Sequence, residues 1–136
     1  MANFYERKKG IAYAMHWWNK RNPDFQIFEN DCTNYVSQCL LAGGFPMEHI
    51  GQKEAGWWYQ GSGLKSDSWS YSWSVAHSLR WYLASKETEA MVSQMEDASQ
   101  LKPGDVICYD FDGDGLWQHN AFVVAENYRG EPLVNA

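Results

Sequence analysis

Cys32 is the residue of this chain best placed to do covalent chemistry. It follows Asp31, a residue type that favours the N-cap of a helix, so we expect Cys32 at a helix start. The helix dipole and the unpaired N–H groups at such a start stabilise a thiolate and can bind an oxyanion. An imidazole beside the sulfur would complete the activation of the nucleophile. The alternative is a cysteine that is simply buried on a helix face.

His119 is the best candidate for the base. It opens a predicted strand directly after a turn rich in Gly and Asp, so its side chain is expected at the rim of a sheet, where a helix start could reach it. The alternative is an exposed histidine at a strand end. We assign structural or solvent-facing roles to the other candidates, which are His16, His49, His77, Cys39 and Cys108.

A third group is expected to orient the imidazole, and Asn135 is the candidate. It lies on the strand that returns from the hairpin begun at His119, and antiparallel pairing brings the end of one strand beside the start of the other. The register depends on the turn, so a polar residue at a strand end is the alternative.

The elements that must position these residues divide into helices first and strands second. Apolar periodicity predicts helices over residues 4–20 and 73–86, and a helix that begins at Asp31 or Cys32 and ends at Gly43-Gly44. A loop rich in Gly, Ser and Trp fills residues 45–71. Strands are predicted over residues 106–109, 118–125 and 132–135. This order indicates one α+β domain that covers residues 1–136.

Composition excludes several classes of protein. The 136 residues carry a net charge of -6, with no basic cluster beyond residues 7–9, which argues against a nucleic-acid partner. Three cysteines give no disulfide framework and no zinc-ligand spacing, so we expect neither a metal nor another cofactor. The chain as given has no membrane-spanning stretch and no export signal. The location stays open: the protein acts at the cell wall or outside the cell if a signal was removed, and in the cytoplasm otherwise. The oligomeric state is open as well.

Two further segments carry alternatives. Residues 110–115 match the first half of a calcium loop, but the twelfth position is Ala121 instead of a bidentate Glu, so we prefer an acidic turn to a weak cation site. Trp57 and Trp58 either stack on a sugar or peptide substrate or pack the long loop. We expect Trp73 and Trp81 to pack their helix.

The motifs together resemble those of a known family. They are DCTNYVSQ over residues 31–38, Gly43-Gly44, Asn22-Pro23, Trp57-Trp58-Tyr59, Ser72 to Ala76, Leu101 to Asp105, His119 to Val124, and Pro132 to Ala136. This set resembles the bacterial putative-amidase domain family, which is related to the NlpC-type cell-wall peptidases and the CHAP amidases. The resemblance covers nearly the whole chain.

The resemblance implies a papain-like fold, with N-terminal helices packed on a small antiparallel sheet. It implies Cys32 as nucleophile, His119 as general base, Asn135 as the third polar residue, and an amide in cell-wall peptide as substrate. Gln26 lies six residues before Cys32, as a glutamine does in papain-type proteases, and with Asn30 it is a candidate oxyanion donor. Family members continue past Ala136, so we expect a truncated domain. The alternatives are a non-catalytic wall-binding module with a Trp-rich loop, and a thioester-dependent acyltransferase.

Overall fold

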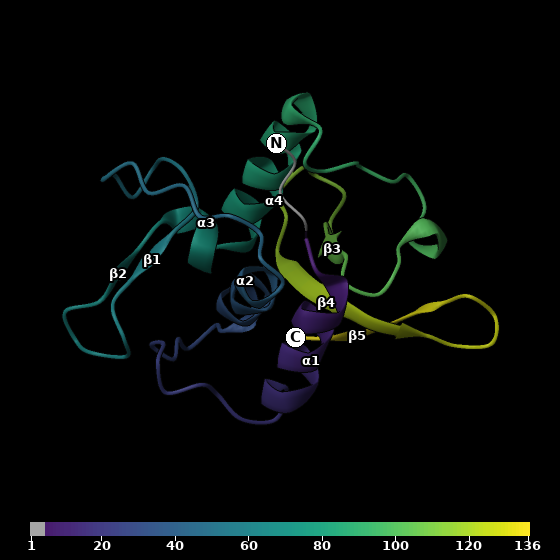
Figure 1. Cartoon of the computed structure of the whole chain (residues 1–136). Helices are drawn as coiled ribbons and strands as arrows, with labels where there is room; N and C mark the ends of the chain where they lie inside the picture. The colour runs from purple at the N-terminus through teal and green to yellow at the C-terminus, as the bar shows by residue number, and fades with distance from the viewer. Residues whose placement is uncertain (1–4) are drawn as a thin grey trace.

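The computed structural model describes residues 5–136 and combines helices with two antiparallel sheets (Figure 1). This confirms the predicted α+β class. The helices are α1 (Arg7–Trp17), α2 (Cys32–Ala42), α3 (Tyr71–Ser74), α4 (Ala76–Ser85) and the short 3-10 helices η1 (Lys86–Glu89) and η2 (Ala98–Gln100). The strands are β1 (Tyr59–Gln60), β2 (Ser68–Trp69), β3 (Val106–Tyr109), β4 (His119–Glu126) and β5 (Pro132–Asn135).

The three-stranded sheet has the order β3-β4-β5, so the long strand β4 lies in its centre. On one side of β4, Tyr109 pairs with His119. On the other side, Asn135 pairs with Phe122, and an irregularity between Val123 and Ala125 shifts the register. The side chains of β4 that alternate toward the helices are thereby fixed relative to both neighbouring strands.

Helix α2 is the centre of the packing, because it contacts α1, α3 and β4 (Figure 1). Eight consecutive residues, Thr33 to Leu40, are buried on it. Gly10 lets α1 approach closely, since a Cβ there would lie 3.1 Å from both the Cys39 carbonyl oxygen and Phe122 Cζ. A helix buried on nearly all sides leaves only its ends accessible for chemistry.

Three features of the helices differ from the sequence expectation. The first helix ends at Trp17, three residues early; its expected residue 4 lies outside the described residues. The expected helix over 73–86 is two helices, because Val75 takes an extended conformation with φ -116° and ψ 123°, which a β-branched residue favours. Trp81 is 55% exposed, since α4 buries Leu79 and two residues further along a helix lie on the opposite face.

The long loop is ordered by its own strand pair and by aromatic packing. β1 and β2 form a hairpin that the sequence pattern did not indicate. Trp57 and Trp73 are fully buried, with ring centroids 5.1 Å apart. No helix in residues 5–136 has both the length and the apolar character needed to cross a membrane.

A buried lysine ties the end of α4 to this loop. The Lys86 ammonium forms ion pairs with Glu48 and Glu89, and the Tyr82 hydroxyl also donates to Glu48 at 2.6 Å. Hydrogen bonds from Lys86 and then Tyr82 hold the pKa of the Glu48 carboxyl below its usual value. Burial lowers the pKa of Lys86, but its hydrogen bonds to Glu48 and Glu89 outweigh this effect and raise it.

We expect Glu48→Gln to lower the free energy of unfolding at neutral pH and to have little effect in acid. A carboxyl whose pKa is lowered by folding stabilises the protein above its unfolded pKa, and this contribution disappears as the pH falls through the folded pKa. Because the Glu48 side chain is 38% exposed, solvent screening limits the loss to about 1 kcal/mol. Urea unfolding at several pH values measures it, with the exposed Glu54→Gln as control. A difference from the control that is constant down to strongly acidic pH would contradict the assignment.

Candidate active site

Cys32 is the first residue of α2, as the sequence predicted. Asp31 stands at the N-cap position, but its carboxylate does not cap the helix. Instead it pairs with Arg21, and its Oδ1 accepts the Phe28 N–H at 3.0 Å and an Asn34 amide N–H at 2.9 Å. Asp31 thus holds the loop before the helix, and its expected role as the capping side chain is not seen.

The start of α2 therefore keeps its backbone donors open. The first hydrogen bond of the helix runs from the Tyr35 N–H to the Asp31 carbonyl oxygen, at 3.0 Å. Within residues 5–136, the N–H groups of Cys32, Thr33 and Asn34 have no acceptor. Such uncapped groups carry the positive end of the helix dipole. Thr33 and Asn34 are buried, so the N–H of the half-buried Cys32 is the one that can donate to an anion beside the sulfur.

A buried hydrogen bond ties this helix start to the sheet. The Thr33 hydroxyl donates to Asn120 Oδ1 at 2.8 Å, and both side chains are almost wholly buried. The other end of the Asn120 amide donates to Cys108 Sγ at 3.2 Å. Because Thr33 follows Cys32 and Asn120 follows His119, this bond ties the backbones of the two predicted catalytic residues to the same end of the α2–β4 contact.

Asn34 holds a second set of segments together. Its Nδ2 donates to the Gln26 carbonyl oxygen at 2.8 Å as well as to Asp31, and its Oδ1 accepts the Trp73 indole N–H at 2.8 Å. The side chain is fully buried. Asp31, Thr33 and Asn34 thus all serve the packing around α2, and Cys32 is the residue of the motif whose side chain joins no other element.

The Cys32 thiol lies beside the side-chain oxygens of two residues close to it in the chain. Its Sγ is 3.9 Å from Asn30 Oδ1 and 3.7 Å from Thr33 Oγ1, and the residue is half-buried. Asn30 is exposed, and rotation of its amide would present N–H groups in place of the oxygen. Gln26 Nε2 instead donates to the Leu64 carbonyl oxygen at 2.5 Å. Of the two expected oxyanion donors, the structure brings Asn30 to the thiol.

His119 lies at the first position of β4, at the rim of the sheet. Its ring is near the aromatic rings of Tyr109 and Phe111, with centroids 5.5 and 6.5 Å away. In residues 5–136 no hydrogen bond joins the His119 ring to the Cys32 thiol. The two residues instead flank the Thr33–Asn120 bond, each one position before a partner in it.

Asn135 is not placed beside His119. It pairs with Phe122, three residues further along β4, and its amide nitrogen lies 3.7 Å from Met15 Sδ on α1. In an antiparallel pair, the partner of His119 would therefore lie three positions after Asn135. The register could not be predicted because it depends on the geometry of the hairpin turn and on the irregularity in β4.

Trp57 and Trp58 do not form an exposed platform. They are 0% and 4% exposed, and the Trp57 indole N–H donates to Ser37 Oγ at 3.1 Å. The Trp58 indole N–H contacts the carbonyl oxygens of Gln52 and Ala55. Both rings belong to the packing of the loop, which argues against substrate binding by this pair.

The acidic turn satisfies itself. Asp110 accepts hydrogen bonds from the backbone N–H groups of Gly113, Asp114 and Gly115. These bonds, and the Gly115 bond most strongly, lower the pKa of the Asp110 carboxyl. Across residues 5–136, no group of three or more His, Cys, Asp or Glu side chains converges as a metal site.

The other two thiols are in different surroundings from Cys32. Cys39 is fully buried inside α2, and burial raises its pKa. Burial also raises the pKa of Cys108, although the hydrogen bond from Asn120 and the charge of Arg80 act in the opposite direction. Neither environment favours a thiolate.

The sequence interpretation missed the structural roles of Asn34 and Asn120. Asn120 directly precedes the apolar run of β4, which was an available signal because a buried amide needs fixed partners. The ion pair of Arg21 with Asp31 could not be predicted from local sequence, because the two residues lie ten positions apart on either side of a loop.

The fold and the site define an α+β domain with a cysteine at an open helix start. The family described as "Putative amidase domain" matches residues 4–136, and the chain belongs to that family. Membership indicates an amidase-like hydrolase. The chain is 47% identical over 132 residues to the uncharacterized protein YhbB of Bacillus subtilis (strain 168), a match that covers 97% of this chain and 41% of that protein. The chain thus spans less than half the length of this relative. No solved structure matches it.

We expect Thr33→Val to lower the free energy of unfolding by about 1–3 kcal/mol, because it leaves the buried Asn120 oxygen without its donor. Urea unfolding measures this loss. Thr88→Val is the matched control, since that hydroxyl donates to the Ser85 carbonyl oxygen on the surface. Equal effects of the two substitutions would show that the Thr33–Asn120 bond does not hold α2 to β4.

Proposed function

We propose that this domain is a cysteine amidase or peptidase with Cys32 as its nucleophile. The observation that carries the proposal is the position of Cys32 at an uncapped helix start, between residues that are all engaged in packing. Membership in an amidase-like family supports the reaction class. His119 supports it through its place at the start of β4, which the Thr33–Asn120 bond ties to the same helix start.

In the proposed reaction, the Cys32 sulfur attacks the carbonyl carbon of an amide. The carbonyl oxygen becomes an oxyanion, which the open Cys32 N–H at the start of α2 stabilises, with the Asn30 amide as a further donor. His119 takes the thiol proton and transfers it to the leaving amine as the C–N bond breaks, which leaves a thioester on Cys32. Water, deprotonated by His119, then hydrolyses the thioester to a carboxylic acid and the free thiol.

A histidine at the sheet rim must move close to the sulfur for this chemistry. Catalytic hydrogen bonds are often long in the absence of substrate and tighten when it binds. We infer that the two residues approach each other in the free protein often enough for His119 to activate the thiol, and that substrate tightens the contact. In the register described above, Asn135 does not orient the imidazole.

The substrate we propose is an amide in cell-wall peptide. The support is the resemblance of the sequence motifs to the putative-amidase family, which implies a relation to the NlpC-type cell-wall peptidases and the CHAP amidases. The same resemblance underlies the proposal of a papain-like fold. A helix start packed against a central antiparallel strand that carries the histidine agrees with such an arrangement.

We expect the protein to release new amine and carboxyl ends from purified peptidoglycan fragments, and Cys32→Ala to abolish this release. Removing a nucleophile that forms the covalent intermediate costs about 10⁴-fold or more in rate. Mass spectrometry of the digests measures the products. Cys39→Ala is the control, since that buried thiol has no part in the reaction.

Equal product from the wild type and Cys32→Ala would rule out Cys32 catalysis. Binding of the fragments by both proteins without any product would favour a wall-binding module. Product that appears only with an added amine acceptor would favour an acyltransferase.

A further inference from the structure

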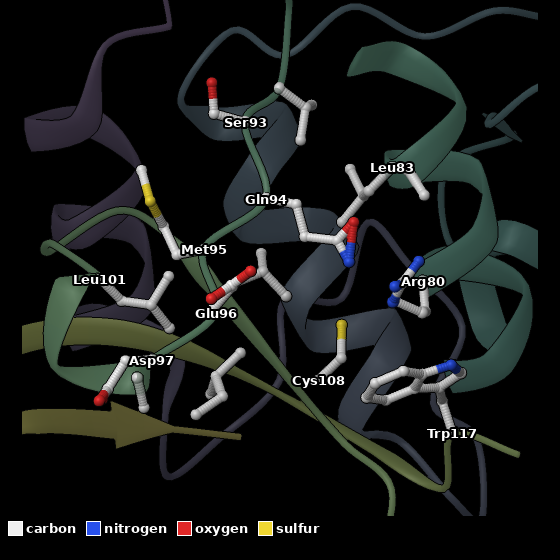
Figure 2. Close-up of a pocket in the computed structure, with 15 residues that line it drawn as sticks. Arg80, Leu83, Ser93, Gln94, Met95, Glu96, Asp97, Leu101, Cys108 and Trp117 are labelled. Carbon is white, nitrogen blue, oxygen red and sulfur yellow. The ribbon is translucent and has the colours of Figure 1, made fainter. Parts of the chain in front are cut away.

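A cavity of about 310 Å³ lies on the side of β3 that faces α4 (Figure 2). Its walls come from α4, from the segment over residues 92–98 and from β3. This volume is at the lower end of the range for small-molecule sites. Its apolar lining includes Leu83, Val106 and Met95. The cavity takes no part in the chemistry proposed for Cys32.

Arg80 gives this cavity its one cationic group among the residues that line it. The side chain is half-buried, and its guanidinium lies between two indoles, 4.7 Å from the Trp117 ring centroid and 5.1 Å from that of Trp81. Within residues 5–136, the Arg80 guanidinium has no carboxylate partner and no hydrogen-bond acceptor. The guanidinium thus contacts the two indole rings, and its N–H donors remain available to a ligand.

His77 contacts both tryptophans beside Arg80. His77 Nδ1 lies 3.2 Å from the Trp117 backbone nitrogen, and its Nε2 lies 3.1 Å from the Trp81 indole nitrogen. A neutral imidazole accepts at one of these nitrogens at a time, so His77 holds one or the other Trp. An arginine stacked in this way loses little side-chain freedom when it binds a planar anion, which favours recognition of a carboxylate.

The charges of the cavity are separated along its length. Figure 2 shows Arg80 and Trp117 on one side, Glu96 and Asp97 on the other, and the Cys108 sulfur between them. Asp97 already accepts the Ser99 N–H at 2.9 Å. Glu96 and Asp97 would repel a second carboxylate on a ligand whose first carboxylate binds Arg80. A ligand with one carboxylate at Arg80 and an apolar body over Cys108 therefore suits the cavity best.

We propose that this cavity binds a monocarboxylate with a short apolar body, anchored by Arg80 against Trp117. The inference is independent of the reaction proposed for Cys32. It is nevertheless linked to that site in space, because Cys108 accepts a hydrogen bond from Asn120, whose oxygen holds Thr33.

The test uses 4-methylpentanoate, which has one carboxylate and no amide that the protein could hydrolyse, and 4-methylpentan-1-ol, its neutral counterpart. In a ¹H–¹⁵N titration up to about 10 mM, we expect the acid to shift signals at Arg80, Trp117 and Cys108, with a Kd of roughly 1 mM or tighter. The alcohol should bind at least about tenfold more weakly, since a hydrogen-bonded charge pair is lost.

Arg80→Gln should weaken binding of the acid by about tenfold or more, and Arg80→Lys by less, because lysine keeps the charge but not the fork of donors. Arg129→Gln is the matched control: that arginine also stacks on an aromatic ring, 5.3 Å from the Tyr128 centroid, but on the exposed β4–β5 hairpin. It should leave binding unchanged. Equal binding of acid and alcohol, no binding by the wild type, or full binding by Arg80→Gln with its fold intact would each overturn the proposal.

Discussion

The hydrogen bond between Thr33 and Asn120 is the contact on which the rest of the site depends. It joins the first turn of the central helix to the second residue of the central strand, and both side chains are too deeply buried for water to replace the bond. An amide buried in an apolar strand is costly unless both its ends are paired, and here Cys108 completes the pairing. The bond therefore fixes where the helix can start relative to the sheet.

The loop before α2 is fixed by a second group of contacts. Asp31 turns away from the helix start toward Arg21 and the backbone of Phe28, while Asn34 reaches both Gln26 and Trp73. A carboxylate that capped the helix would have used the donors an oxyanion needs. The motif thus combines a rigid support with an open end, and Cys32 occupies that end.

Local signals in the sequence predicted part of this arrangement well. The start of α2 at Cys32 followed from the residue types around it, and the bounds of β3 and β5 followed from short apolar runs between turns. Interactions between distant segments were out of reach. The exposure of Trp81 depends on which face of α4 is buried, and the partner of Asn135 depends on a register that one irregularity changes. Trp57 and Trp58 are both buried beside the β1–β2 hairpin, and no turn motif in the sequence predicted that hairpin.

The central proposal for this site is that the open helix start and His119 make Cys32 a reactive nucleophile. Its most direct test is the rate of alkylation by iodoacetamide at about pH 6.5, where an ordinary thiol reacts slowly. Peptide mass spectrometry follows each cysteine, with glutathione as the reference for an exposed thiol. We expect Cys32 to react at least about tenfold faster than glutathione, and His119→Ala to lower the Cys32 rate to that of glutathione. A Cys32 rate at or below that of glutathione, or one unchanged by His119→Ala, would contradict it.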